Sequence, residues 1–210
     1  MACQKELNAV MGSNQFRSQH QAWAIELSSR HKSDLLMALG AQGGALLLFM
    51  LCGVNEKEEK LTTVIAVPSP LWLSSLRAQL NKVRITVREW KTGVKKMDSR
   101  PSVLLVLTAT TATPEFRLFF FELCWQRVIA RLLFDQIHLF LSPLLVNLLP
   151  TFNLHEKLPE GLVPFVGTSP ALAQDVVTNL VMHKLHFRPG STQLVQDKQL
   201  LHPNIYYSAF

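Results

Sequence analysis

The sequence has few cysteines, and their spacing builds no site. Its 210 residues include three cysteines, Cys3, Cys52 and Cys124, which lie far apart in the chain. An odd number at such distances excludes a disulfide framework and a zinc site of the Cys/His type. A reducing compartment is therefore expected, and we expect the protein to be nuclear or cytoplasmic.

Other signals are also missing. The N-terminal segment MACQKELNAVMGSNQ lacks the apolar stretch of a secretory signal peptide. We find no internal repeat, no low-complexity tract, and no helix-turn-helix, zinc or RNP-type signature of sequence-specific nucleic-acid recognition. The chain is 48% apolar with a mean hydropathy of +0.17, which excludes a mostly disordered protein and suits one globular domain.

Charged side chains are absent from residues 35–54, a run long enough for a membrane-spanning helix. A buried parallel strand at 35–39, a glycine turn and a helix at 46–52 give the same composition, because both faces of a parallel sheet are covered. Gly40, Gly43 and Gly44 interrupt the run where that turn is needed. We therefore favour the strand–turn–helix unit and expect no membrane contact.

Apolar runs alternate with helical patterns along the chain. Further strands are expected at 63–67, 83–90, 103–107, 132–137 and 162–166, and further helices at 15–30, 71–81, 115–131 and 144–149. This alternation predicts an α/β fold with a largely parallel, doubly wound sheet of five to seven strands. The strands at 64–67, 103–107, 132–137 and 162–166 should be neighbours. A ligand site is expected at their carboxyl ends.

The glycine turn has the position of a phosphate loop but lacks its reactive residues. Such a loop ends in Gly-Lys-Ser or Gly-Lys-Thr, and here Ala45 and Leu46 follow Gly43 and Gly44. The glycine backbone can still bind a phosphate. The lysine charge that would neutralise the γ-phosphate and the Ser/Thr ligand of Mg²⁺ are lost. Losing one charge-assisted contact typically costs about 1.5–3 kcal/mol. A tight turn without any ligand is the alternative.

The run at 132–138 has the form of a buried strand ending in Asp-Glu-x-His, with Gln136 in place of the glutamate. Asp135 can hold Mg²⁺ through water. Gln136 cannot take a proton from an attacking water, because an amide is not basic near neutral pH. Alternatively, Asp135 caps a turn and His138 has no special role.

Short segments resemble, in order, the motifs of the first motor domain of RecQ-like DNA helicases, in particular those of fungal mobile and telomere-linked elements. They are FRSQHQ at 16–21, GAQGGALLLFML at 40–51, TTVIAVP at 62–68, VLLVLT at 103–108, TPEF at 113–116, FDQIH at 134–138, VGT at 166–168 and PNIYYS at 203–208. The family has GTGGGKSLLFML, TTVVIVP, IDECH and RPNIxYSV at four of these places. The resemblance spans residues 16–208.

The resemblance implies a RecA-like, P-loop NTPase fold in a DEAD/DEAH-box helicase that unwinds DNA 3'-5', with ATP and Mg²⁺ as cofactors. It divides the chain into a tail at 1–14, the ATP-binding domain at 15–200 and, at 201–210, the start of a linker to a second motor domain. It gives roles to the following residues. The residues that would face the nucleotide are Gln21, Gly40, Gly43, Gly44 and Ala45. The acidic motif would consist of Asp135, Gln136 and His138. The coupling motif would be Gly167 and Thr168, and the positions at the DNA backbone would be Pro68 and Thr108.

Positive charge is concentrated in one stretch of the sequence. The net charge is +6 with a pI near 9.4, and the stretch contains Arg77, Lys82, Arg84, Arg88, Lys91, Lys95, Lys96 and Arg100. Such a stretch attracts phosphate backbones without sequence preference, and Trp72 and Trp90 are candidates for stacking on bases. We expect this stretch at the carboxyl edge of the sheet. An ordinary solvated surface with core tryptophans is the alternative.

Two functions from different classes follow. The first is an ATP-dependent helicase motor, which the family implies. The second is a non-catalytic DNA-binding or interaction module on a helicase-derived fold, whose partners are DNA and a complete helicase or second motor domain. Positions 45, 46 and 136 favour the second function, and a decayed gene product is a further alternative. A lone first motor domain would not translocate on DNA.

Overall fold

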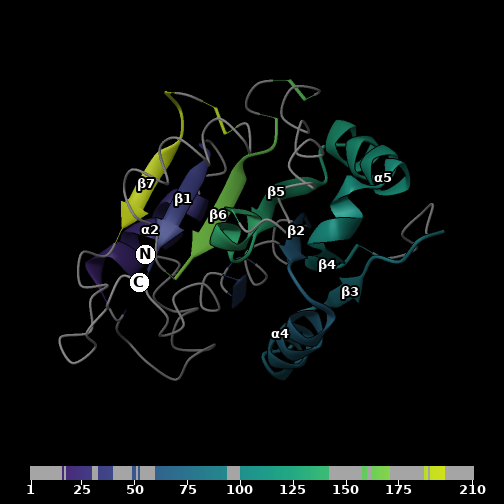
Figure 1. The fold of residues 1–210 in the computed structure, drawn as a ribbon, viewed down its shortest axis with the longest axis horizontal. Coiled ribbons are helices and arrows are strands. Elements are labelled where there is room, and N and C mark those ends of the chain that lie inside the picture. The colour runs from purple at the N-terminus through teal and green to yellow at the C-terminus, as the bar shows by residue number, and fades with distance from the viewer. Residues whose placement is uncertain are drawn as a thin grey trace.

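In the computed structural model, the described residues are 16, 18–29, 33–39, 49–50, 52, 60–93, 100–141, 158–159, 162–170, 187–188 and 190–196. Within them, strands form one sheet in the order β3-β4-β2-β5-β6-β1-β7. They are β1 Leu35–Ala38, β2 Thr62–Val67, β3 Val87–Glu89, β4 Val103–Leu107, β5 Ile129–Phe134, β6 Phe165–Ser169 and β7 Gln193–Gln196. All neighbouring pairs are parallel, so the carboxyl ends of the strands share one edge (Figure 1).

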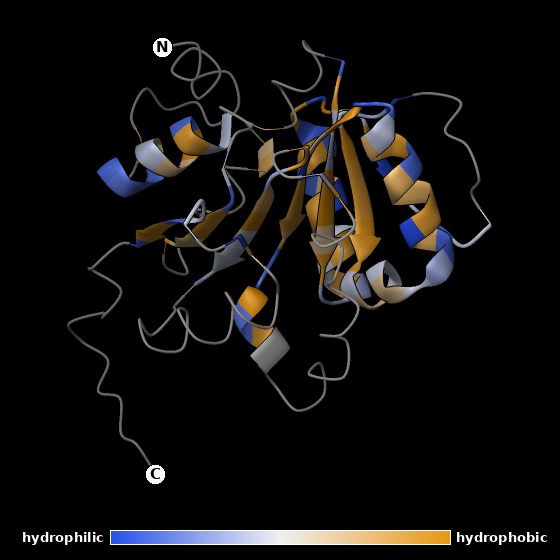
Figure 2. Cartoon of the chain, turned by 90° about the horizontal axis from the view of Figure 1, so that it is seen from above, coloured by the Kyte–Doolittle hydropathy of each residue, from blue (hydrophilic) through white to orange (hydrophobic). Residues whose placement is uncertain are grey.

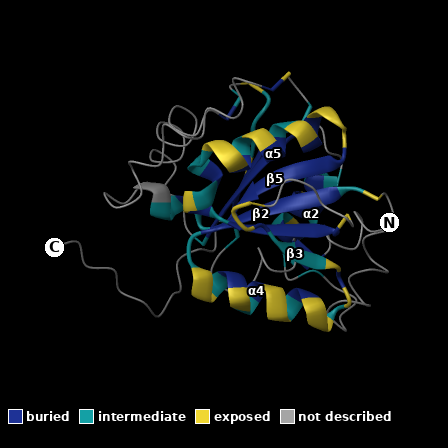
Figure 3. Cartoon of the chain, turned by 90° about the vertical axis from the view of Figure 1, so that its right-hand side faces the viewer, coloured by how far each residue is buried: buried dark blue, intermediate teal, exposed yellow. Residues whose placement is uncertain are grey.

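Helices cover both faces of the sheet. The α-helices are α2 Gln19–Ser29, α4 Pro70–Lys82 and α5 Pro114–Trp125, and two 3-10 helices are η1 Thr108–Ala112 and η2 Ile137–Leu141. Successive strand residues face opposite sides. Val64 and Ala66 pack with the aromatic residues of α5, whereas Ile65 and Val67 pack with α2 and α4. Figure 3 shows α4 and α5 on opposite sides of the buried strands.

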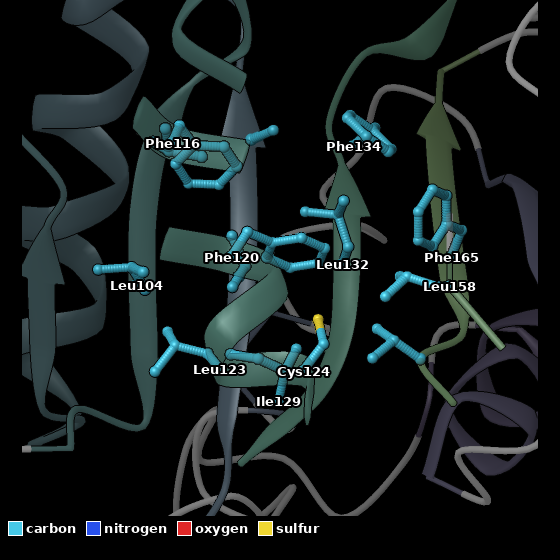
Figure 4. Packing of buried hydrophobic residues seen from close by; sticks show 14 of the residues in the cluster. Leu104, Phe116, Phe120, Leu123, Cys124, Ile129, Leu132, Phe134, Leu158 and Phe165 are labelled. Atoms are coloured by element: carbon cyan, nitrogen blue, oxygen red, sulfur yellow. The ribbon is translucent and has the colours of Figure 1, made fainter. Parts of the chain in front are cut away.

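The core explains why the strands are almost wholly apolar. Figure 2 shows apolar strands between helices with mixed surfaces, as expected for a sheet that is covered on both faces. Phe116 and Phe120 of α5 stack with their ring centroids 5.8 Å apart, and Phe120 lies beside Leu132 of β5 (Figure 4). The two described cysteines, Cys52 and Cys124, are both buried thiols.

The predicted fold class and the neighbouring core strands are confirmed. The strands β4, β2, β5 and β6 are consecutive in the sheet, and β1 is the strand expected before the glycine turn. The helix predicted at 71–81 is α4. It begins at the N-cap Ser69, whose hydroxyl accepts a hydrogen bond from the Trp72 backbone N–H, and it buries Leu73, Leu76 and Leu80.

Several predicted boundaries are wrong, and backbone conformation explains two of them. The strand predicted at 83–90 is reduced to β3, because Arg84 has a φ of 59° and breaks the extended chain. The helix predicted at 115–131 ends at Trp125, because Arg127 has a φ of 56° and cannot continue a helix. Consequently β5 starts earlier than predicted, and it ends at Phe134. The strand β6 lies three residues later than predicted. The sequence did not predict β7.

Some predictions fall outside the described residues. These are the glycine turn at 40–45, the helix at 144–149 and the segment at 203–208. Of the helix predicted at 46–52, Phe49, Met50 and Cys52 are described, and they are helical and buried. Across the described part of the chain, no helix is both long enough and apolar enough to cross a bilayer.

A candidate site at the carboxyl edge of the sheet

The strand register brings four of the predicted site residues to one edge of the sheet. Val67 pairs with Leu107, so Pro68 and Thr108 follow neighbouring strands side by side. Phe134 pairs with both Ala66 and Gly167, which places Asp135 between the ends of β2 and β6 and next to Thr168. The acidic motif, the coupling motif and the predicted DNA-facing positions therefore meet at this edge.

Asp135 is the centre of this edge, and its carboxyl group is surrounded by donors. Its Oδ1 accepts a hydrogen bond of 2.7 Å from the Thr168 hydroxyl, and its Oδ2 accepts one from the indole Nε1–H of Trp72. The Gln136 backbone N–H also donates to the carboxyl group. The residue is 3% exposed. Asp135 thus joins α4, β5 and β6 at a point with little solvent.

Burial dominates the ionisation of Asp135. Removal from water raises its pKa, and hydrogen bonds from Thr168, Trp72 and the Gln136 backbone oppose this rise, as does the charge of His138. Burial lowers the pKa of His138, although the neighbouring Asp135 acts in the opposite direction. His138 Nδ1 lies 3.0 Å from the hydroxyl of Ser169. The acidic motif therefore contacts β6 through two adjacent pairs.

Gln136 provides no base beside Asp135. Its side chain is an amide, and its backbone is in the left-handed region with a φ of 54°. A backbone of this kind is uncommon outside glycine, asparagine and aspartate. A proton from an attacking water therefore has no acceptor at position 136.

The surroundings of Asp135 do not fit a magnesium site. Mg²⁺ keeps several waters in an octahedral shell and needs a carboxylate oxygen that is open toward them. Both oxygens of Asp135 already accept hydrogen bonds, and three donors fill most of about four lone-pair positions. Within the described residues, no group of three His, Cys, Asp or Glu side chains is arranged to hold a metal ion.

Gly167 allows the close packing of β6. A Cβ atom there would lie 2.6 Å from Ile137 Cδ1 and 2.9 Å from Leu36 Cδ2, so both of these buried side chains would have to shift to admit one. Ile137 belongs to η2, directly after the acidic motif. The glycine therefore lets β6 approach that motif, and the adjacent Thr168, which is 2% exposed, reaches Asp135.

The structure does not gather the basic stretch on one surface, so that expectation is corrected. Lys91 follows β3 at the carboxyl edge, whereas Lys82, Arg84 and Arg100 precede β3 and β4 at the opposite edge. The reason is that α4 runs back along the sheet and carries its C-terminal charges away from the carboxyl edge.

Arg77 and Arg88 differ from the other basic residues of the stretch in their surroundings. Arg77 lies 3.8 Å from Glu89, so part of its charge is offset. Arg88 alternates with Glu89 along β3 and therefore faces the side that carries α5. Lys95 and Lys96 fall outside the described residues.

The remaining predicted residues are placed as follows. Trp90 is 5% exposed and packs edge-on against Phe116, so it belongs to the core and is not available for stacking on bases. Thr108 is also buried, which leaves Ala109 as the exposed residue there. Gln21 is buried on α2. The loop that it was expected to serve, with Gly40, Gly43, Gly44 and Ala45, lies outside the described residues.

Sequence reasoning missed the partners of the acidic motif. Ser169 directly follows the predicted coupling motif, and this position is its only sequence signal. Trp72 lies 63 residues before Asp135 and has no sequence signal for this contact. Only the geometry of α4 relative to β5 shows it.

The raised pKa of Asp135 predicts a specific pH dependence of stability. The folded state holds the proton more tightly than the unfolded state, so this group's contribution is lost as pH rises from about 3.8 through the raised folded value. Relative to Asp135→Asn, the wild type should therefore lose stability from about pH 4 toward neutral pH. Urea unfolding of both proteins over this range measures the difference.

The control for this experiment is the same pair of proteins in a His138→Asn background. His138, whose folded pKa is lowered, contributes stability that is lost as pH falls, and its pKa depends on Asp135, so it does not cancel between the two proteins. A difference between wild type and Asp135→Asn that stays constant, or that grows in favour of the wild type as pH rises, contradicts the prediction.

Comparison with known proteins supports the fold assignment. No protein-family model matches the chain, and no curated protein matches it. Among solved structures, it resembles the DUF1998 helicase MrfA bound to DNA, with a TM-score of 0.68 and 12% identity over 92% of this chain and 29% of that one. The same helicase bound to DNA and AMPPNP gives a TM-score of 0.67 at 13% identity, with the same coverage.

A second helicase extends the comparison. The UvsW helicase from Bacteriophage T4 gives a TM-score of 0.56 at 13% identity, over 84% of this chain and 59% of that one. The chain thus spans about a third of MrfA and somewhat over half of UvsW. It has a helicase-like, RecA-type α/β fold.

Proposed function

We propose that this chain is a helicase-derived domain that binds DNA through the phosphate backbone and does not hydrolyse ATP. The observation that carries the proposal is the state of the acidic motif. Asp135 is buried beneath Trp72 and Thr168, and its neighbour Gln136 provides no base. Ala45 and Leu46 support the loss of hydrolysis from the sequence side. The RecQ-like, mobile-element ancestry is part of this proposal and rests on the ordered motifs.

The carboxyl edge of the sheet offers groups that suit a phosphate backbone. The helices α4 and α5 begin there, at the N-caps Ser69 and Thr113, and helix N-termini attract anions. Lys91 adds an exposed positive charge at the same edge. DNA-bound helicases of similar fold support DNA as the partner class. ATP, with or without Mg²⁺, and a second motor domain remain proposed ligands and partners.

Salt dependence tests the proposed DNA binding. Weak, non-specific binding to single-stranded DNA should weaken with salt, with a slope of about −0.7 per phosphate contact on a log–log plot. Reversing Lys91, Lys95 and Lys96 to glutamate should flatten this slope by about 2 if each makes one contact. Fluorescence anisotropy of a labelled oligonucleotide measures the slope.

A matched variant tests whether the result depends on which charges are reversed. Reversing Lys82, Arg84 and Arg100 to glutamate changes the net charge equally at the opposite edge of the sheet. This control should shift affinity only slightly and leave the slope nearly unchanged. Equal slopes in the two triple variants, or no binding at about 50 mM salt, contradict the proposal and favour a decayed gene product.

A further inference from the structure

The side chain of Trp72 lies over the acidic residue at the end of β5. Trp72 is in the first turn of α4, where its backbone N–H is 3.2 Å from the N-cap oxygen of Ser69. Its indole Nε1–H donates to Asp135 Oδ2. The N-cap bond sets the first turn of α4, and the indole bond ties that turn to the end of β5. The indole is only a donor and has no lone pair for a metal ion.

We infer that the Trp72 indole N–H has taken the position of metal-bound water at Asp135, so that this acid is a structural acceptor and not a metal ligand. A hydrated Mg²⁺ ion presents water hydrogens and a positive charge to an acidic strand end. The indole presents one N–H to the same oxygen, without the ion. The Thr168 hydroxyl at 2.7 Å occupies the other oxygen.

This arrangement has a structural consequence. Because Asp135 is nearly inaccessible, a divalent cation can reach its Oδ2 only if the Trp72 indole moves away and its hydrogen bond breaks. The bond instead ties α4, β5 and β6 together in the absence of any ion. The carboxyl edge of the sheet near Pro68 therefore keeps this arrangement without a metal ion.

Indole signals in ¹H–¹⁵N spectra report on this bond directly. The four tryptophans give four signals, which single Trp→Phe variants assign. The Trp72 indole proton should exchange with solvent far more slowly than those of Trp125 and Trp23, which are 64% and 46% exposed. Exchange as fast as that of Trp125 overturns the inference.

Paramagnetic Mn²⁺ is the metal probe on the same sample. A bound Mn²⁺ ion at Asp135 would broaden the Trp72 signal before the others. We expect no selective broadening at millimolar Mn²⁺. Selective loss of the Trp72 signal, reversed by excess Mg²⁺ and absent in Asp135→Asn, would establish a metal site and overturn the inference.

A double-mutant cycle tests the coupling of the two side chains. Trp72→Phe keeps the ring and removes the N–H, and Trp125→Phe is the matched exposed control. Trp72→Phe should lower the unfolding midpoint more than the control does, and this loss should shrink in an Asp135→Ala background, which has no side-chain acceptor. Additive losses overturn the inference. If Trp72→Phe does not fold, the exchange and Mn²⁺ measurements on the wild type still decide it.

Discussion

Purified protein incubated with ATP, Mg²⁺ and single-stranded DNA is expected to release no phosphate above background. Gln136 cannot accept the proton of the attacking water, and a positioned base typically contributes about 10²–10⁴-fold to such a reaction. With Ala45, the lysine charge that would neutralise the γ-phosphate is absent, and with Leu46 the Ser/Thr metal ligand is absent. These losses act on the same transition state, so we expect the combined effect to bring turnover below detection in a phosphate-release assay.

The control for this prediction is a variant of the same preparation. Asp135→Ala removes the last carboxylate of the acidic motif, so any turnover that it retains comes from a contaminating ATPase. Turnover that single-stranded DNA stimulates and Asp135→Ala abolishes contradicts the prediction. Restoring Ala45→Lys, Leu46→Ser and Gln136→Glu should recover nucleotide binding at most, because Trp72 still covers Asp135.

Asp34→Ala is expected to destabilise the fold by about 3–5 kcal/mol, because it breaks a buried ion pair and leaves its partners unsatisfied. The Asp34 side chain is fully buried, and Arg188 donates to its two oxygens at 2.7 and 2.9 Å. The backbone N–H groups of Phe165 and Arg188 also donate to it. One carboxylate thus joins β1, the start of β6 and the segment before β7, and denaturant unfolding measures its loss.

Glu89→Ala provides the matched comparison for Asp34→Ala. It also removes one acid from an ion pair, but Arg77 and Glu89 are 52% and 29% exposed and 3.8 Å apart. Exposed pairs contribute about 0–1 kcal/mol. An Asp34→Ala loss as small as that of Glu89→Ala would show that the buried pair does not hold the amino ends of these strands together.

The sheet was predictable because its strands are buried on both faces. Runs such as 103–107 and 132–134 are wholly apolar, and the alternation with helices is enough to predict parallel order. Element ends were less predictable. The left-handed residues Arg84 and Arg127 end their elements without glycine or proline, the usual sequence signals for a break.

The site was predictable only in part. The predicted pairing of neighbouring strands accounts for the contact between Asp135, which follows β5, and Thr168, which lies near the end of β6. The basic stretch is continuous in sequence, yet it spans the sheet, with Lys82, Arg84 and Arg100 at the amino edge and Lys91 at the carboxyl edge. The contact between Trp72 and Asp135 depends on helix placement, which no local pattern encodes. The buried pair of Asp34 and Arg188 likewise joins residues that are 154 positions apart.

Titration calorimetry with a non-hydrolysable ATP analogue, performed with and without Mg²⁺, tests the central claim most directly. That claim is that a helicase-like fold has lost metal-dependent nucleotide chemistry at Asp135. The account predicts that the two titrations superimpose, because Mg²⁺ has no open ligand at the end of β5. Saturable binding that requires Mg²⁺ and disappears in Asp135→Ala would contradict it.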